Sequence, residues 1–416
     1  MKFADTPPMG WNSWDCYGTA VNEEIVRANA RFMAEHLKEY GWEYVVVDIQ
    51  WYEPGAVNHE YRPFAPLCMD EYGRLLPAEN RFPSAAGGRG FAPLAEYVHS
   101  LGLKFGIHIM RGVPRQAAAA RTPILGCDRT ADQIANPYDI CVWNPDMYGV
   151  RSDAEGAREY YQSLISLYAD WGVDFIKVDD ICREFRIGEI RLLHEAIMES
   201  GREIVLSLSP GPAPVEKAEE FKQVANMWRI TDDFWDKWEL LYDMFSRAEK
   251  WCIHSGNGCW PDADMLPIGP ILQDYDRANR TKFTKAEQKT MLSLWAMMRS
   301  PLIIGGEMTG FDEFTMGLLT NRELLEITKH THSAHPLFRR GEPGKESIAW
   351  FTTHERQGYY LALFNCDDRA KEIAAELPVP GRFAVSDVWS GEGLGTAEGS
   401  FGAEVEVHGA RVFRLK

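Results

Sequence analysis

The sequence predicts a (β/α)₈ barrel followed by an all-β sandwich domain, because two contrasting patterns divide its 416 residues. Most of the chain alternates short apolar runs with amphipathic helical patterns, which is typical of a parallel sheet whose strands are buried on both faces. After residue 335, short strand patterns are separated by Gly, Asn, Asp and Pro, and no long helical pattern intervenes. We therefore expect a barrel domain at residues 1–332 and a β-sandwich domain at residues 333–416.

Six apolar runs without polar alternation predict strands of the barrel. They span residues 44–48, 104–108, 175–179, 204–209, 227–231 and 301–305. The repetition of strand and helix on this scale favours a closed barrel over a doubly wound open sheet. No GxGxxG motif follows a strand, which further weakens the open-sheet alternative.

Helix boundaries are marked by capping residues. Asn22 is the expected N-cap of a helix that ends at Gly41, and a second apolar stripe covers residues 161–171. Thr284 and Glu287 have the spacing of a capping box ahead of a further helix. In the C-terminal part, four strand patterns cover residues 348–353, 359–364, 383–389 and 405–413.

The composition restricts the class of partner. The chain has 44 basic and 61 acidic residues and a net charge of −17, so it repels nucleic acid and anionic membranes, whereas a neutral sugar is compatible with it. The N-terminus carries no apolar signal core, so we expect a cytoplasmic protein, with a homo-oligomer left open. Eight scattered cysteines form no CxxC pair, which predicts free thiols and no zinc knuckle.

Several predicted barrel strands end in polar or ionisable groups. They are Asp48, His108, Asp179 with Asp180, Ser209, and Asp232 with Asp233. The carboxyl ends of barrel strands converge on the face where active sites lie. Hydrolysis of a glycosidic bond needs one ionised carboxylate and one carboxylic acid, and nearby cations such as Lys177 and Arg229 favour the ionised form. Each Asp alone could instead be a helix cap or a structural ion pair.

A catalytic metal is a competing interpretation of the same strand ends. Metal-dependent barrel hydrolases usually use several His ligands, whereas His108 is alone on its strand, so we expect no metal and no cofactor. Four tryptophans in loop-like segments near strand ends favour a sugar site, because indoles pack against the apolar faces of sugar rings. They are Trp14, Trp51, Trp143 and Trp260, and packing is the alternative role for the last three.

Seven ordered motifs resemble glycoside hydrolase family 27 of clan D, the α-galactosidases and α-N-acetylgalactosaminidases. They are PPMGWNSW (7–14), DEYGRL (70–75), NRFP (80–83), LGLKFGI (101–107), DWGVDFIKVD (170–179), WR (228–229) and DADML (262–266). The resemblance implies a retaining mechanism on an α-linked sugar, with Asp179 as nucleophile and Asp233 as general acid/base. It also implies a set of sugar-binding residues, namely Trp14, Asp48, His108, Lys177, Ser209, Arg229, Asp264 and Met265.

Departures from the family pattern leave the sugar open. Many relatives carry a second Asp at the position of Ile49, and a Tyr at the position of His108. Ser209 stands where galactose-specific relatives carry Glu, and the segment 110–115 has no counterpart. The leading hypothesis is an exo-acting hydrolase of terminal α-galactosides. The alternatives are an α-N-acetylgalactosaminidase, a β-L-arabinopyranosidase, whose substrate has the ring stereochemistry of galactose, and a non-catalytic sugar-binding protein.

Overall fold

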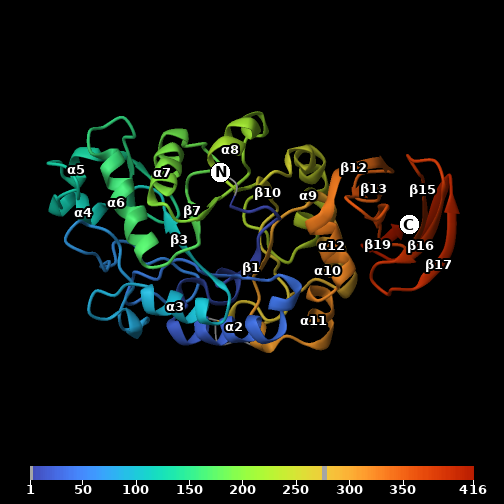
Figure 1. Cartoon of the computed structure of the whole chain (residues 1–416), viewed down its shortest axis with the longest axis horizontal. Coiled ribbons are helices and arrows are strands. Elements are labelled where there is room, and N and C mark those ends of the chain that lie inside the picture. Colours follow the sequence, from blue (N-terminus) through green and yellow to red (C-terminus); the bar gives the residue numbers. More distant parts are fainter. Residues whose placement is uncertain (1–2, 274–278) are drawn as a thin grey trace.

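The computed structural model describes residues 3–273 and 279–416, and its larger part is a barrel of eight parallel strands (Figure 1). The strands are β1 (Met9–Asn12), β2 (Tyr44–Val47), β3 (Lys104–Met110), β7 (Phe175–Asp179), β8 (Val205–Leu208), β9 (Met227–Arg229), β10 (Trp260–Asp262) and β11 (Leu302–Ile304). They are hydrogen-bonded in chain order, and β1 pairs with both β2 and β11. A parallel bridge between Leu266, just after β10, and Ile304 closes the ring.

The predicted barrel is confirmed, and all six predicted strand runs overlap a barrel strand. The apolar runs succeed because these strands are buried almost throughout. Strands β1 and β10, which are only four and three residues long, were not predicted. Pro261 lies in β10 and obscures its strand pattern, since proline cannot donate to a sheet ladder.

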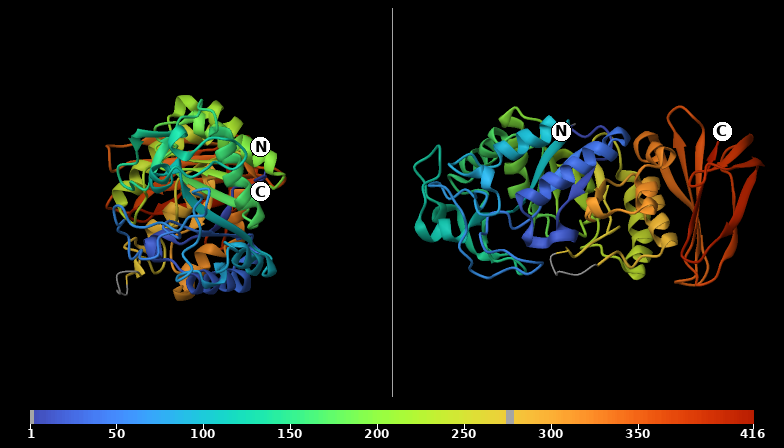
Figure 2. Two further views of the ribbon diagram at one scale, coloured as in Figure 1. Left: turned by 90° about the vertical axis from the view of Figure 1, so that its left-hand side faces the viewer. Right: turned by 90° about the horizontal axis from the view of Figure 1, so that it is seen from below.

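Helices connect the strands and surround the barrel (Figures 1 and 2). They are α1 (Trp14–Tyr17), α2 (Glu23–His36), α3 (Ala92–Ser100), α4 (Arg115–Ala120), α5 (Ala131–Ile134), α6 (Ala157–Asp170), α7 (Ile187–Ser200), α8 (Ala218–Val224), α9 (Trp238–Trp251), α10 (Lys285–Met298), α11 (Glu313–Leu319) and α12 (Arg322–His330). The hydrophobic core includes residues from these helices and from the strands that they cover.

The predicted helix caps are present. The Asn22 side chain accepts a hydrogen bond from Ile25 N at 3.0 Å, and Thr284 and Glu287 form both bonds of the capping box. Helix α2, which was predicted to end at Gly41, ends earlier, at His36, and a 3₁₀ turn then leads to Gly41. Gly41 has φ +97°, a left-handed conformation that glycine adopts without steric cost.

A small antiparallel sheet, absent from the sequence prediction, interrupts the barrel between β3 and α6. Its strands are β4 (Val113–Pro114), β5 (Ala135–Ile140) and β6 (Met147–Val150), in the order β4-β6-β5. The segment 110–115, which had no recognised counterpart, leads from β3 into this excursion. The excursion therefore begins at the carboxyl end of a barrel strand, next to the predicted active-site face.

The C-terminal part is all β, as predicted, and is an eight-stranded antiparallel sheet. Its strands are β12 (Thr331–Arg340), β13 (Ser347–His354), β14 (Tyr359–Asn365), β15 (Lys371–Glu376), β16 (Arg382–Asp387), β17 (Gly393–Glu398), β18 (Ser400–Val405) and β19 (Ala410–Leu415). The order is β12-β13-β14-β19-β16-β17-β18-β15, and one core joins residues of β13 with residues of β15. The sheet therefore folds over on itself to form the sandwich.

Two details of this sandwich differ from the prediction. The run 405–413 is not one strand, because a turn at residues 406–409 separates β18 from β19. Strands β12, β15 and β17, and all of β18 except Val405, were also missed, since most of their residues are not buried. The chain passes from α12 into β12 at Thr331, and the domain division at residues 332 and 333 stays a prediction.

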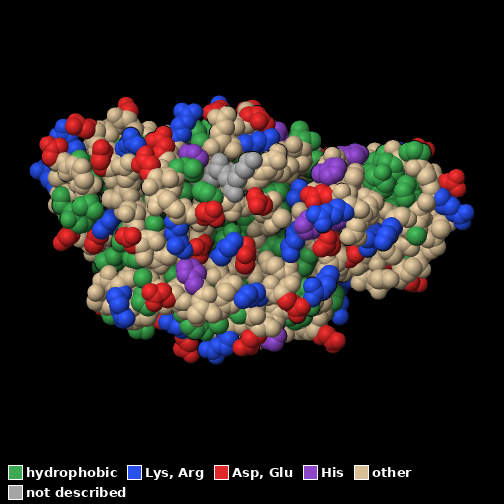
Figure 3. All heavy atoms as spheres, in the orientation of Figure 1, with side chains coloured by type: hydrophobic (Ala, Val, Ile, Leu, Met, Phe, Trp, Pro, Cys, Tyr) green, Lys and Arg blue, Asp and Glu red, His purple; other side chains and the backbone are tan. Residues whose placement is uncertain are grey.

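The surface charges, the cysteines and the lengths of the helices bear on the remaining predictions. Acidic and basic side chains are interspersed on the face shown in Figure 3. All eight cysteines lie among the described residues, and none forms a disulfide. Within residues 3–273 and 279–416, no helix has the length and apolar character needed to cross a membrane. Met1 and Lys2, at the N-terminus that is predicted to carry no signal core, lie outside the described residues.

Candidate active site

A cavity of about 300 Å³ opens at the carboxyl ends of the barrel strands. It brings together the catalytic and sugar-binding residues that the family resemblance implies: Trp14, Asp48, His108, Lys177, Asp179, Ser209, Arg229, Asp233, Asp264 and Met265. These residues lie at or just after the ends of β1, β2, β3, β7, β8, β9 and β10. Convergence of strand ends in the barrel therefore explains how residues as far apart in the sequence as Trp14 and Met265 share one pocket.

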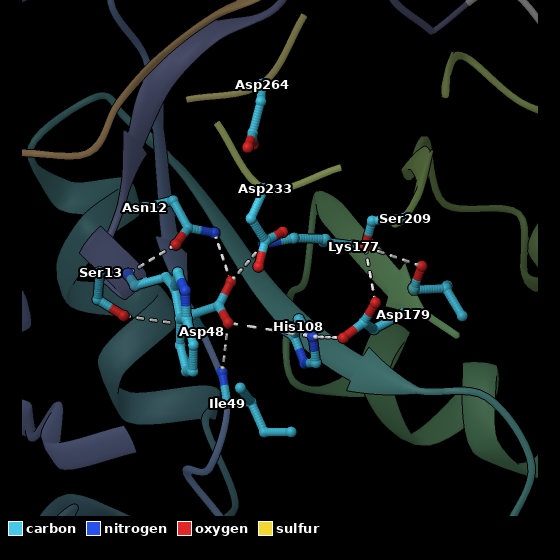
Figure 4. Close-up of polar contacts among 12 residues, drawn as sticks. Asn12, Ser13, Asp48, Ile49, His108, Lys177, Asp179, Ser209, Asp233 and Asp264 are labelled. Atoms are coloured by element: carbon cyan, nitrogen blue, oxygen red, sulfur yellow. Dashed lines mark hydrogen bonds and ion pairs between the residues drawn. The ribbon is translucent and has the colours of Figure 1, made fainter. Parts of the chain in front are cut away.

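Asp48, directly after β2, is the polar centre of one wall (Figure 4). Its Oδ2 accepts hydrogen bonds from Asn12 Nδ2 at 2.7 Å and from Lys177 Nζ at 2.9 Å. Burial opposes ionisation of Asp48, but the charges of His108 and Lys177 and the hydrogen bonds outweigh it and lower the pKa. The wall thus presents a fixed carboxylate and an ammonium group, which can accept from and donate to neighbouring sugar hydroxyls.

Asp179 ends β7 and projects into the same cavity (Figure 4). Its Oδ2 lies 3.5 Å from His108 Nε2, and its Oδ1 accepts the Asp180 N–H at 2.9 Å. Burial alone would raise the pKa of Asp179, but His108, Lys177 and the Asp180 N–H together lower it to about 2. The group is therefore a carboxylate at neutral pH, the state that attack on an anomeric carbon requires.

Asp233 lies in the loop after β9, and 56% of its side chain is accessible, more than for Asp48, Asp179 or Asp264. Its Oδ1 is 3.1 Å from Arg229 Nη2, and the same guanidinium contacts Asp264 Oδ1 at 2.7 Å. Burial, with the negative charges of Asp233 and Asp262, raises the pKa of Asp264 despite Arg229. An accessible carboxyl at the pocket mouth is suited to exchange a proton with a leaving group that departs into solvent.

Ser209 and Ile49 are two further residues of the cavity wall. Ser209 is buried, and its hydroxyl lies 3.4 Å from Asp179 Oδ1 and 3.3 Å from the Val178 carbonyl oxygen. Ile49, with 1% of its surface exposed, lines the cavity with an apolar side chain, while its N–H donates to Asp48 Oδ1. The pocket therefore has a small hydroxyl beside Asp179 and a hydrocarbon surface beside Asp48.

The tryptophan prediction is correct in part. Trp14 and Trp143 line the cavity, and the Trp14 ring stacks on Tyr61 at a centroid distance of 5.9 Å. The prediction that Trp51 and Trp260 line the cavity is wrong, because each is packed in the interior. Their indole N–H groups donate to the carbonyl oxygens of His108 and Ala4, which satisfies the polar end of a buried indole.

Several pocket residues could not be predicted from the sequence pattern. They are Asp15, Tyr61, Arg183, Pro210, Phe234 and Trp235. Asp15 is buried and its Oδ2 has no hydrogen-bond partner among the described residues. Burial, followed by the charge of Asp264, raises the pKa of Asp15 well above its usual range. Its position directly after Trp14 was the available signal.

No set of three or more His, Cys, Asp and Glu side chains in the described part of the chain is arranged to hold a metal ion. The polar groups of the pocket instead pair with one another, as Asp48 does with Lys177 and Arg229 with Asp264. The arrangement can bind a polyhydroxylated ring and place one ionised and one accessible carboxyl against it.

Comparison with known families gives two matches that together span most of the chain. The model described as "Alpha galactosidase A" matches residues 6–127 and 146–330. The model described as "Alpha galactosidase C-terminal beta sandwich domain" matches residues 345–415. The gap at residues 128–145 covers β5 and the turn towards β6, so the excursion between β3 and α6 is only partly represented in the family model.

Individual relatives agree with these matches. The chain is 27% identical to alpha-galactosidase 3 of Arabidopsis thaliana, over 99% of this chain and 82% of that protein. It is 50% identical, with a TM-score of 0.96, to a GH27 β-L-arabinopyranosidase from Geobacillus stearothermophilus crystallised with arabinose, over 100% and 98% of the two chains. A Bacillus halodurans protein assigned provisionally as an α-N-acetylgalactosaminidase is 49% identical, with a TM-score of 0.88 over 99% and 97%.

Proposed function

Because the chain belongs to glycoside hydrolase family 27, the α-galactosidase family, we propose that it is a retaining exo-glycosidase that favours terminal β-L-arabinopyranosides. The enzyme class and a carbohydrate substrate follow from the family. The observation that carries the finer proposal is Ile49, an apolar wall residue where many relatives carry an Asp that binds an outer hydroxyl. A cavity of about 300 Å³ is at the small end of ligand pockets, as expected for one sugar ring.

The proposed mechanism is a double displacement. Asp179 attacks the anomeric carbon while the carboxylic acid of Asp233 protonates the departing oxygen, so the glycosidic bond breaks as a glycosyl–Asp179 ester forms. Asp233, now a carboxylate, then removes a proton from water, which attacks the anomeric carbon. The bond between that carbon and Asp179 breaks, and the sugar leaves with its original anomeric configuration. The low pKa of Asp179 and the exposed position of Asp233 support this division of roles.

Ile49 favours a pentopyranose for a simple energetic reason. A β-L-arabinopyranoside has the ring stereochemistry of an α-D-galactopyranoside but lacks the hydroxymethyl group. Placing that hydroxymethyl group against the Ile49 hydrocarbon leaves a buried hydroxyl without a partner, which costs about 1–3 kcal/mol. The hydrogen that arabinopyranose carries at this position pays no such desolvation penalty. The same ring contacts, to Asp48 and Lys177, remain available to both sugars.

Replacing Ile49 with Asp is expected to shift the preference towards the hexoside. The new carboxylate would accept a hydrogen bond from the hydroxymethyl group, so the ratio of kcat/KM for nitrophenyl α-D-galactopyranoside to that for nitrophenyl β-L-arabinopyranoside should rise at least about 10-fold. The unchanged enzyme should prefer the arabinopyranoside. Ile49→Leu is the matched control, because it keeps an apolar side chain of equal size and should keep the preference. An unchanged ratio in Ile49→Asp, in a folded protein, would remove Ile49 from the explanation.

The alternative at the sugar's 2-position is an acetamido group. Ser209 is a short side chain, and one structural relative is provisionally assigned as an α-N-acetylgalactosaminidase. However, the Ser209 hydroxyl is in contact with the Asp179 carboxylate and the Val178 carbonyl oxygen. It therefore does not face an open space that an acetamido group could fill. A nitrophenyl α-N-acetylgalactosaminide is therefore the third substrate of the same panel. A cytoplasmic location stays a prediction, which cell fractionation can test, and sedimentation can determine the oligomeric state, which the sequence leaves open.

A further inference from the structure

Arg111, directly after β3, is a buried arginine that joins four separate parts of the barrel face. Its side chain is only 2% exposed. The guanidinium contacts three carboxylates: Asp139 Oδ1 at 2.7 Å, Asp180 Oδ2 at 2.9 Å and Glu189 Oε1 at 3.1 Å. These partners come from β5, from the residue that follows β7, and from α7. A rigid five-donor fork is needed for such a set of contacts, which a lysine cannot reproduce.

The contacts to Asp180 include its backbone as well as its carboxylate. Arg111 Nε donates to the Asp180 carbonyl oxygen at 2.5 Å, and the Arg111 backbone N–H donates to the Asp179 carbonyl oxygen at 3.1 Å. Arg111 thus binds both peptide units around Asp180. It holds the chain at the point where β7 ends and the pocket begins.

Asp180 has a backbone conformation that needs such support. Its φ is +59°, in the left-handed region, which is unfavourable for residues other than glycine. In this conformation the Asp180 N–H donates to Asp179 Oδ1 at 2.9 Å. A rotation of the 179–180 peptide unit that brought residue 180 to a right-handed or extended conformation would turn this N–H away, and one oxygen of Asp179 would lose its hydrogen bond. The orientation of the Asp179 carboxylate therefore depends on the backbone at residue 180.

We propose that Arg111 is a positioning residue for the nucleophile: it fixes the backbone of Asp180, and the Asp180 N–H in turn orients the Asp179 carboxylate. This inference rests on the proposed function, in which Asp179 attacks the sugar. It also assigns a role to the segment 110–115, which had no recognised counterpart. Asp139, one of the carboxylates that hold the guanidinium, lies within the stretch 128–145 outside the family match.

The surrounding contacts make Arg111 the centre of the network rather than one member of an exposed ion pair. Glu189 also accepts the Tyr161 hydroxyl at 2.5 Å and the Val150 N–H at 3.2 Å, which fixes it in place. Arg186 shares Asp139 with Arg111, at 3.1 Å from Asp139 Oδ1, and is one-third exposed. Arg186 thus offers a matched comparison: it is a second arginine on the same carboxylate, at the edge of the network.

The test compares Arg111→Lys and Arg111→Met with Arg186→Met, using the nitrophenyl glycoside that the unchanged enzyme hydrolyses fastest. A small displacement of a reacting group costs about 10²-fold in rate, so both Arg111 variants should lose about 10²-fold in kcat. KM and the inhibition constant of free L-arabinose should change less than about 3-fold, because the sugar-binding walls are untouched. Arg186→Met should keep kcat within about 3-fold of the unchanged enzyme, since the backbone contacts to Asp180 remain.

The outcomes separate this proposal from the proposed function. A wild-type kcat in Arg111→Lys, in an active enzyme, would overturn the positioning role and leave the mechanism intact. Equal losses in kcat and in L-arabinose binding would also overturn it, because they indicate a distorted pocket. If Arg111→Met does not fold, the Arg111→Lys variant, which keeps the charge, gives the decisive comparison. An unchanged enzyme that hydrolyses none of the glycosides would overturn both proposals.

Discussion

Asp179→Ala is expected to lower kcat by about 10⁴ to 10⁶-fold, as removal of a catalytic nucleophile does in other hydrolases. The carboxylate is held ionised by His108, Lys177 and the Asp180 N–H, and alanine leaves no group that can form the covalent ester. Binding of L-arabinose should persist, because Asp48 and Lys177 are unaffected. Turnover of a nitrophenyl glycoside and calorimetric binding of L-arabinose measure the two properties separately.

Azide provides a stereochemical check on this variant. The anion can occupy the space left by the Asp179 carboxylate and attack the anomeric carbon from the same side, giving a glycosyl azide of inverted configuration. Activity of more than a few per cent in Asp179→Ala without azide would contradict the nucleophile assignment. An azide product of retained configuration would also contradict it, because it would place the nucleophile elsewhere.

Asp233→Ala is expected to show a loss that depends on the leaving group. General acid catalysis contributes about 10² to 10⁴-fold, so natural-type glycosides with poor leaving groups should lose that much in kcat/KM. A dinitrophenyl glycoside needs little protonation and should form the glycosyl–enzyme at nearly the normal rate. The intermediate should then accumulate, because no base activates water, and azide should restore turnover. The azide product should have retained configuration, since azide attacks the ester formed on Asp179.

Asp232→Ala is the control for Asp233. Asp232 is the adjacent carboxylate, is more than half exposed, and pairs with Arg183 at 2.5 Å. Both carboxylates line the cavity, but they contact different arginines. Asp233 contacts Arg229, which also contacts Asp264. If Asp232→Ala reproduces the leaving-group dependence and the azide rescue while Asp233→Ala does not, the acid/base role belongs to Asp232.

Apolar strand runs and helix-capping residues made the fold predictable from the sequence. The barrel strands are buried on both faces, so runs such as 104–108 and 175–179 contain few polar residues, and caps such as Asn22 and Thr284 use local hydrogen bonds. Elements fixed by tertiary context were missed. The three-residue strand β10 contains Pro261, and β5 and its neighbours have no regular pattern because the excursion is held by side-chain contacts such as Arg111 with Asp139.

The same distinction applies to the site. Residues at strand ends, such as Asp48 and Asp179, share the pocket because the barrel topology brings them together. Asp15 and Tyr61 enter it from a short helix and a loop, whose positions no periodicity specifies. The errors at Trp51 and Trp260 have a different cause, since a tryptophan near a strand end packs inward when a backbone carbonyl can accept its N–H.

The central claim, that Asp179 is the nucleophile of a retaining glycosidase, is tested most directly by trapping the covalent intermediate. A 2-deoxy-2-fluoro-β-L-arabinopyranosyl fluoride slows hydrolysis of the glycosyl–enzyme, and mass spectrometry of the digested protein locates the added sugar. The mechanism predicts one fluorosugar per chain. The sugar should be attached to Asp179, in the peptide that includes this residue and Asp180. A label on another residue, or no label from an enzyme that hydrolyses the unsubstituted sugar with inversion, would contradict it.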